Sequence, residues 1–312
     1  MQTELGGPLA LGSQSVGPQS ERPSVPVHYA YVARYEYSDV VVQNDNFLRL
    51  SPYDDRYQTP AEGGCDIFTI PAGRKITYPD RLGNEVNRIR ITAPHRELII
   101  AATGRVCLND HAPVLDDAPL ASLTYGLDAQ EFLTASLLAD PETVLAAARE
   151  AVGSASTLLD TVRSVVTWVY EHIRYERGNT SVNTPAADVL DSQSGVCQDM
   201  THLALAMLRA HGVPARYVSG LLTRQPGETH AWLEFLHPEL GWLPADPTKG
   251  AMELNGADYL KFAVGRDYSE VPPVSGSFVS RGEGWLNFTT AEVFFDRETV
   301  SMDDALALLN GS

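Results

Sequence analysis

Hydrophobic and polar residues alternate over much of the first third of the chain. HYAYVARYEYSDVVV is dense in β-branched and aromatic residues, and RKITYPDRLGNEVNRIRI holds two alternating runs around a turn at Gly83–Asn84. PHRELIIAATGRVCL predicts two more strands that meet near Thr103–Gly104. This pattern predicts an antiparallel β-sandwich or barrel over residues 27–112. Residues 1–26, rich in Gly, Pro, Ser and Gln, are expected to be a disordered lead.

After a connection over residues 113–140, the hydrophobic period becomes helical. One predicted helix carries an apolar stripe of Leu158, Val162, Val165, Val166, Val169 and Ile173. The next helix begins near Val196 and ends at His211–Gly212, and three short strand-like runs follow it: ARYVSGLLT, THAWLEFL and GWLPAD. Tight turns between those runs predict an α+β domain over residues 141–312, in which a helix packs on an antiparallel sheet.

The composition argues against several classes of partner and site. The formal net charge is −17, so the surface repels nucleic acids and anionic membranes. No stretch approaches the roughly 18 apolar residues of a membrane span, and the N-terminus lacks a secretory pattern, so we expect a cytoplasmic protein. Three cysteines without a CxxC pair argue against a disulfide framework or a zinc knuckle.

One of the three cysteines, Cys197, lies where the helix after Val196 begins. The partial positive charge of a helix N-terminus stabilises a thiolate, and the free N–H groups of the first turn can bind an oxyanion. Gly195 would let a substrate carbonyl approach closely. The position therefore predicts a nucleophile rather than a packing residue.

A nucleophilic thiol needs a base, and His230 and Asp246 are the best candidates. His230 begins one predicted strand and Asp246 ends the next, so a hairpin would bring them side by side. His230 would accept the thiol proton, and Asp246 would orient the ring. His202 and His211 compete as bases, but His202 points away from Cys197 on the helix and His211 lies at its far end.

Four motifs in order and spacing resemble the core of bacterial and archaeal transglutaminase-like proteins, members of the papain-like cysteine enzyme superfamily. They are GVCQDMTHLALAMLRAHGVPARYVSG, THAWLEF, GWLPADPT and GRDYSEVPP. RYEYSDVVVQNDNFLRLSPY and DRLGNEVNRIRITAPHRELII resemble the β-rich domain that precedes this core. The resemblance covers roughly residues 28–280. It implies the same trio, Cys197, His230 and Asp246, and a catalytic domain over residues 141–312.

Other positions have two interpretations each. Asp199 matches the family's cysteine-x-aspartate pattern or is a carboxylate at the helix dipole. Arg266 and Asp267 match a downstream family motif, although a structural Arg–Asp pair that holds the C-terminal segment is favoured. Trp232 lines the cleft or belongs to the core. Gln193 is a candidate second oxyanion donor.

These features predict covalent chemistry on an amide through a thioester, which water or a primary amine then resolves. The expected substrate is a peptide or protein amide, with the glutamine side chain as a candidate, and no cofactor or metal is expected. The alternatives are a non-catalytic peptide-binding module on the same scaffold and a metal site formed by the three residues, for which no fourth ligand is apparent.

Overall fold

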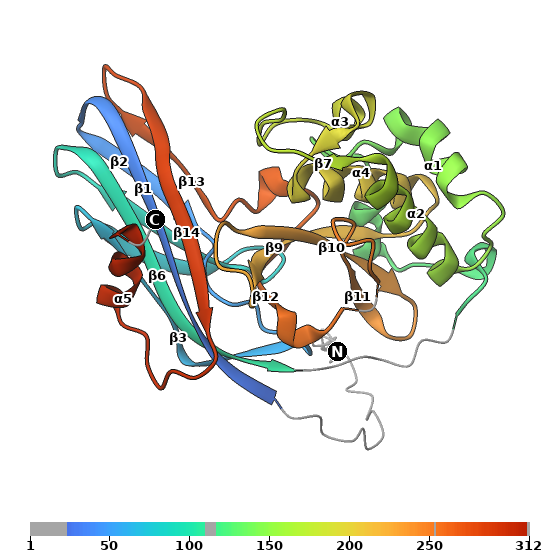
Figure 1. The fold of residues 1–312 in the computed structure, drawn as a ribbon, viewed down its shortest axis with the longest axis horizontal. Helices are drawn as coiled ribbons and strands as arrows, with labels where there is room; N and C mark the ends of the chain where they lie inside the picture. Colours follow the sequence, from blue (N-terminus) through green and yellow to red (C-terminus); the bar gives the residue numbers. More distant parts are fainter. Residues whose placement is uncertain (1–23, 110–116, 253, 311–312) are drawn as a thin grey trace, which may run out of the picture.

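The computed structural model describes residues 24–109, 117–252 and 254–310, and its strands and helices form two units (Figure 1). The predicted disordered lead lies mostly outside the described residues, and its last three residues belong to the first strand. Within the described residues, no helix is both long enough and apolar enough to cross a membrane.

The first unit, called here the β unit, is a sandwich of two antiparallel sheets, which confirms the predicted class. One sheet has the strand order β14-β1-β6-β3 and the other β13-β2-β5-β4. The strands are β1 (Ser24–Val41), β2 (Gln43–Leu48), β3 (Gln58–Ile70), β4 (Arg74–Pro79), β5 (Glu85–Ile91), β6 (His95–Asn109), β13 (Val274–Val279) and β14 (Gly284–Phe294). Alternating apolar residues of both sheets form one buried core between them.

Two details of the β unit differ from the sequence-based expectation. PHRELIIAATGRVCL forms one continuous strand, β6, instead of two strands that meet at Thr103–Gly104. Gly104 does not mark a turn. A Cβ at this position would lie 2.5 Å from the ring of Tyr29 on β1, so the glycine makes room for that ring inside the sheet.

The second difference concerns the C-terminal segment, which the sequence placed in the domain of residues 141–312. Strand β14 pairs antiparallel with β1, and β13 pairs with β2. The last helix, α5 (Met302–Ala307), packs on β1 and β6, and the Ser301 side chain caps its N-terminus. Residues 274–310 therefore complete the β unit, because each sheet gains its outer strand from the end of the chain.

The second unit, called here the mixed unit, has helices on one face of an antiparallel sheet with the order β11-β10-β9-β12. Its strands are β9 (Ala215–Leu222), β10 (His230–His237), β11 (Gly241–Ala245) and β12 (Tyr259–Gly265). Its helices are α1 (Leu145–Val152), α2 (Leu158–His172), α3 (Ala186–Ser192) and α4 (Cys197–Ala210), and α4 packs on β9 and β10. The predicted stripe on α2 is buried throughout, as the helical period required.

A buried polar network joins the two units. The side-chain amide of Gln58 on β3 donates to the carbonyl of Lys261 on β12 and accepts that residue's N–H. The Lys261 ammonium pairs with Asp55 and Glu234, and Glu234 also binds Arg216 at 2.7 Å. Because a buried ion pair is stable only when its geometry is kept, this network fixes the units relative to one another.

Candidate active site

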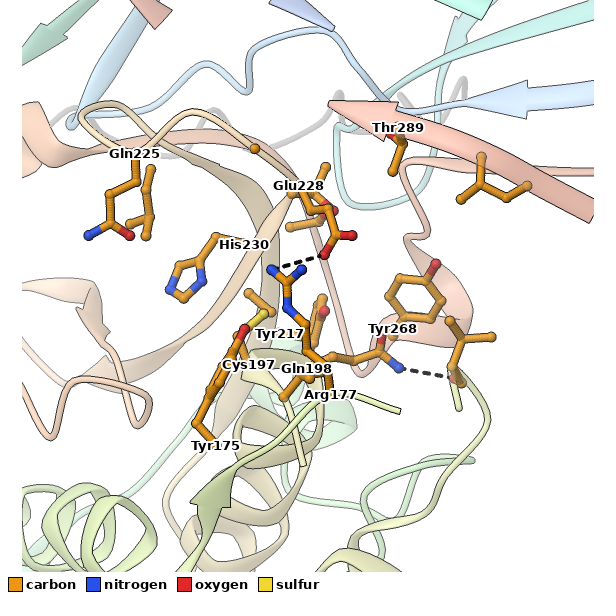
Figure 2. Close-up of a pocket in the computed structure, with 18 of the residues that line it drawn as sticks. Tyr175, Arg177, Cys197, Gln198, Tyr217, Gln225, Glu228, His230, Tyr268 and Thr289 are labelled. Atoms are coloured by element: carbon orange, nitrogen blue, oxygen red, sulfur yellow. Dashed lines mark hydrogen bonds and ion pairs between the residues drawn. The ribbon is translucent and has the colours of Figure 1, made fainter. Parts of the chain in front are cut away.

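A pocket of about 370 Å³ opens between the start of α4, the loop before β10 and strand β14 of the β unit (Figure 2). Cys197 and His230 both line it. Three tyrosines and an exposed ion pair between Arg177 and Glu228 add to its wall; the tyrosines are Tyr175, Tyr217 and Tyr268. Residues Leu286 and Thr289 of β14 also contribute, so both units build the pocket.

Local structure places Cys197 as the first residue of α4. Just before it, strand β8 (Ser194–Gly195) pairs in parallel with β7 (Arg174–Tyr175), which follows α2. The preceding residue, Val196, is extended, and its N–H donates to the carboxylate of Asp199 at 2.8 Å. This N-terminal arrangement leaves the first-turn N–H groups of α4 without partners inside the helix, as at every helix start.

The predicted hairpin brings His230 and Asp246 together. His230 is the first residue of β10, and Asp246 follows β11, its antiparallel partner. The Nε2 of His230 donates to Oδ2 of Asp246 at 2.9 Å, and the same ring lines the pocket together with Cys197, whose thiol acts to raise the pKa of the imidazole. The imidazole is 9% exposed and Asp246 is fully buried. His230 therefore lies between the buried carboxylate of Asp246 and the pocket that it shares with Cys197.

The surroundings favour a charged imidazole. Burial opposes protonation of His230, but its bonds and charge interactions with Asp246 and Cys197 outweigh burial and raise its pKa from 6.5 to about 9. Burial also opposes ionisation of Asp246, yet the hydrogen bond and charge of His230 hold the carboxyl pKa below its ordinary value. Each partner therefore stabilises the charged form of the other.

Tyr259, which the sequence analysis did not select, donates from its hydroxyl to the same Oδ2 of Asp246 at 2.8 Å. The Thr248 N–H donates to the other oxygen at 2.9 Å, so both carboxylate oxygens are held. Trp232 does not line the pocket of Cys197. It is buried behind His230, with the two rings stacked at 6.2 Å, and it also packs on Tyr259.

Asp199 is buried beside the nucleophile position. Its Oδ2 accepts from the Thr180 hydroxyl at 2.6 Å as well as from Val196, while burial raises the pKa of its carboxyl. A Cβ at Gly195 would lie 2.6 Å from the Cβ of Asp199. Gly195 is therefore required by the packing of Asp199, and it does not line the pocket.

The remaining candidates lie away from the pocket. Gln193 is exposed, adopts a left-handed conformation (φ +50°) at the end of α3 and does not line the pocket. The expected Arg266–Asp267 pair is replaced by an ion pair of Arg266 with Glu270 at 2.6 Å. Asp267 turns inward and accepts from the N–H groups of Leu138 and Ser269, because its burial demands partners.

The competing histidines have other partners. His202 is buried, and its Nε2 accepts the N–H of Tyr268 at 3.2 Å; His211 bonds to the carbonyl of Ala148. The other two cysteines are free, like Cys197, and lie in the β unit. Burial raises the pKa of Cys65 to about 12. Among the described residues, no group of three or more His, Cys, Asp or Glu side chains is arranged to hold a metal ion.

Comparison with known proteins places the chain in a family. The profile of the transglutaminase-like superfamily core matches residues 145–247, which include Cys197, His230 and Asp246, and that of the bacterial transglutaminase-like N-terminal region matches residues 27–107. An uncharacterised protein of Mycobacterium tuberculosis is 31% identical over 273 residues, which cover 80% of this chain and 86% of the relative. The chain belongs to the transglutaminase-like superfamily. Tyr259 and the pocket residues of β14 lie outside both matched regions.

Two further proteins are similar to this chain over different extents. The crystal structure of a candidate cysteine protease from Cytophaga hutchinsonii has a TM-score of 0.73 at 20% identity and covers 90% of this chain and 93% of its own, so the two share a fold. A protein-glutamine gamma-glutamyltransferase of Pseudomonas aeruginosa is 34% identical over 113 residues, which are 32% of this chain and 17% of that protein.

Proposed function

We propose that the protein is a cysteine-dependent enzyme that acts on amide bonds through a thioester, with Cys197 as nucleophile, His230 as acid and base, and Asp246 as the orienting carboxylate. The observation that supports this most is the placement of one imidazole between a thiol and a buried carboxylate at the wall of a pocket. A histidine with only one of these partners is common in structural roles.

The proposed acylation begins with transfer of the Cys197 proton to the free nitrogen of His230. The sulfur attacks the amide carbon, and the carbonyl oxygen becomes an oxyanion next to the first-turn N–H groups of α4. When the intermediate collapses, the C–N bond breaks and the imidazolium proton goes to the leaving nitrogen. Ammonia or an amine leaves, and a thioester remains on Cys197.

Deacylation uses water or a primary amine as the second nucleophile. His230 takes the proton of that nucleophile while its oxygen or nitrogen attacks the thioester carbon, and the thiol leaves with the proton. Water gives hydrolysis, as in an amidase or protease, and an amine gives transamidation. The activity named for the Pseudomonas relative favours the glutamine side-chain amide of a peptide or protein as the acyl donor.

Intact-mass measurement of the full chain tests the proposal. The protein is incubated with small glutamine amides and with glutamine-containing peptides, each with and without an added primary amine. We expect a covalent adduct in the wild type and none in Cys197→Ala. Release of free acid alone assigns hydrolysis, and an amine conjugate assigns transamidation. If no donor gives an adduct or turnover, the proposed chemistry is wrong.

The same preparation separates the proposal from a non-catalytic peptide-binding module. At mildly acidic pH, iodoacetamide should modify Cys197 well before Cys65, whose thiol pKa burial raises to about 12. Equal labelling of the two cysteines, together with equal peptide affinity of wild type and Cys197→Ala, would support the binding module instead. A cytoplasmic location remains part of the proposal, as does the absence of nucleic-acid and anionic-membrane partners, which the net charge of −17 supports.

A further inference from the structure

A second hollow, of about 210 Å³, lies at the open edge of the β unit. Strands β13 and β14, the outer strands of the two sheets, form one side of it. The other side comes from Tyr35 and Tyr37 of β1 and from Asn44 and Asn46 of β2. None of the described residues that line this hollow is charged, so its chemistry suits a neutral ligand.

The two asparagines differ in a way that points to a ligand. Asn44 is 2% exposed, and its amide donates to the hydroxyl of Tyr37 at 2.8 Å. Asn46 is 5% exposed and lines the same hollow, but its Nδ2 has no hydrogen-bond partner among the described residues. Buried donors without partners are rare in native proteins, and an incoming acceptor would satisfy this one.

The rim of the hollow is apolar and exposed. Trp285 is 47% exposed, Leu286 is 48% exposed and Phe278 is 38% exposed. Phe278 packs edge-to-face on Tyr37, with the ring centroids 4.9 Å apart. Neighbouring exposed aromatic and aliphatic side chains around a concave site are typical of a binding surface.

Strand β14 connects this hollow to the pocket of Cys197. Leu286 lines both, and Thr289, three residues further along the strand, lines the pocket of Cys197. The outer edge of β14 already takes a partner from the mixed unit, because Ala291 and Gly227 exchange backbone hydrogen bonds of 2.6 and 2.9 Å. Trp285 and Leu286 lie beyond that bridge, where an extended polypeptide could follow the same edge.

We propose that the hollow is a second subsite for the polypeptide whose amide reacts at Cys197. An aromatic or large aliphatic side chain of the substrate packs against Trp285 and Phe278, and Asn46 donates to a main-chain carbonyl beside it. The intervening segment follows β14 past Leu286. This inference rests on the proposed function for its substrate class, and it makes the β unit part of substrate selection.

The test measures binding of peptides to the full chain that carries Cys197→Ala, so that turnover plays no part. The probes are a short glutamine amide and longer peptides in which one tryptophan is placed at increasing distances from one glutamine. We expect one spacing to bind best. Adding Trp285→Ala or Asn46→Ala should weaken that peptide about tenfold, or 1.4 kcal/mol, relative to the short amide. Tyr78→Ala, an exposed aromatic on β4 at the opposite edge of its sheet, is the matched control and should have no effect.

Asn46 is buried, so its variant can fail to fold, whereas Trp285 is half-exposed and its truncation keeps the test available. The inference is overturned if affinity is independent of spacing, or if Trp285→Ala and Tyr78→Ala bind the best peptide equally well. Failure of the proposed function looks different: wild type then forms no acyl-enzyme with any amide, while spacing-dependent binding to the Cys197→Ala chain still reports on the subsite.

Discussion

The regions around His230 and His202 each place a buried histidine near a carboxylate, yet they push its protonation in opposite directions. His230 bonds directly to Asp246, and its pKa rises to about 9. Burial lowers the pKa of His202 well below 6.5, although the charge of Asp267 partly opposes the shift. The Nε2 of His202 accepts a backbone N–H, a bond that the neutral ring makes.

The difference shows what a histidine needs besides a nearby acid. Asp246 gives one oxygen to His230, so the carboxylate charge reaches the ring through a hydrogen bond. The carboxylate oxygens of Asp267 instead accept hydrogen bonds from the N–H groups of Leu138 and Ser269. Its charge therefore reaches His202 without a direct hydrogen bond. His230 also lines the pocket, whereas His202 is fully buried. Direct bonding and access therefore separate a candidate base from a structural histidine.

The largest expected effect comes from replacing each of these two histidines with alanine. His230→Ala should lower the acylation rate by about 10²–10⁴-fold, because the thiol loses its base and the leaving group its acid. His202→Ala should leave the rate per folded molecule within about twofold but reduce the free energy of unfolding by about 1–3 kcal/mol, since it leaves the partly buried N–H of Tyr268 without its acceptor. Single-turnover kinetics and urea unfolding measure the two effects. Equal losses of activity in both variants would contradict the comparison.

The next effect concerns the two carboxylates. Asp246→Asn keeps the shape but removes the charge that holds the imidazolium, so we expect the acylation rate to fall by about a hundredfold. Asp267→Asn is the matched control, because it neutralises the carboxylate near His202 and should change stability more than rate. The acylation rate of each variant, divided by the fraction of its molecules that are folded, distinguishes the two carboxylates. If Asp267→Asn is the slower enzyme, Asp246 is not the orienting carboxylate.

The sequence was sufficient to predict the helices, the sandwich and the sheet of the mixed unit, because period and turn residues are local signals. The sequence was not sufficient to predict which strands pair with β1. That strand pairs with β14, whose residues lie more than 240 positions away, and alternation alone does not name a partner strand. For the same reason the sequence did not predict that Leu286 and Thr289 line the pocket. They lie on β14, whose place beside the pocket depends on its pairing with β1.

Cys197, His230 and Asp246 were recognisable as candidates because each lies at the end of a strongly patterned element. Tyr259 was not, because its hydroxyl meets Asp246 only through the register of β12 on β9. Gly195 was expected to admit a substrate carbonyl, whereas in the structure it makes room for the buried Asp199, a contact that residue type and spacing do not show. Residue type and spacing thus identify groups at element ends, whereas side-chain contacts across strands require the fold.

A smaller effect follows from pH. Because the pKa of His230 is raised to about 9, the acylation rate should fall about tenfold per pH unit above that value as the imidazolium is lost. The stability contributed by His230 is complete below 6.5 and is lost as pH rises through about 9. For His202 the sign is reversed: the unfolded chain binds the proton more readily, so stability falls as pH decreases below 6.5.

Rate profiles and urea unfolding of wild type and Asp246→Asn over the same pH range check these signs. The variant should lose rate at a lower pH than the wild type, because its ring no longer bonds to a charged carboxylate. His202→Ala should remove part of the loss of stability below pH 6.5. It should not move the alkaline limb, which is the fall of the acylation rate at high pH. An alkaline limb that is unmoved in Asp246→Asn would assign that limb to a group other than His230.

The smallest effect tests how far the carboxylate depends on its third donor. Burial and the neighbouring Asp246 raise the pKa of Tyr259 far above 10, so its hydroxyl stays protonated and donates throughout the working range. Tyr259→Phe should slow acylation about threefold at neutral pH, because His230 and Thr248 still hold Asp246 while its orientation loosens. The alkaline limb should move to higher pH, since a carboxylate with one donor fewer binds the imidazolium more strongly.

Tyr53→Phe is the matched control: it removes a hydroxyl that donates to the Leu82 carbonyl within the same cluster. If both variants shift the limb equally, the shift comes from packing in that cluster and not from the bond to Asp246.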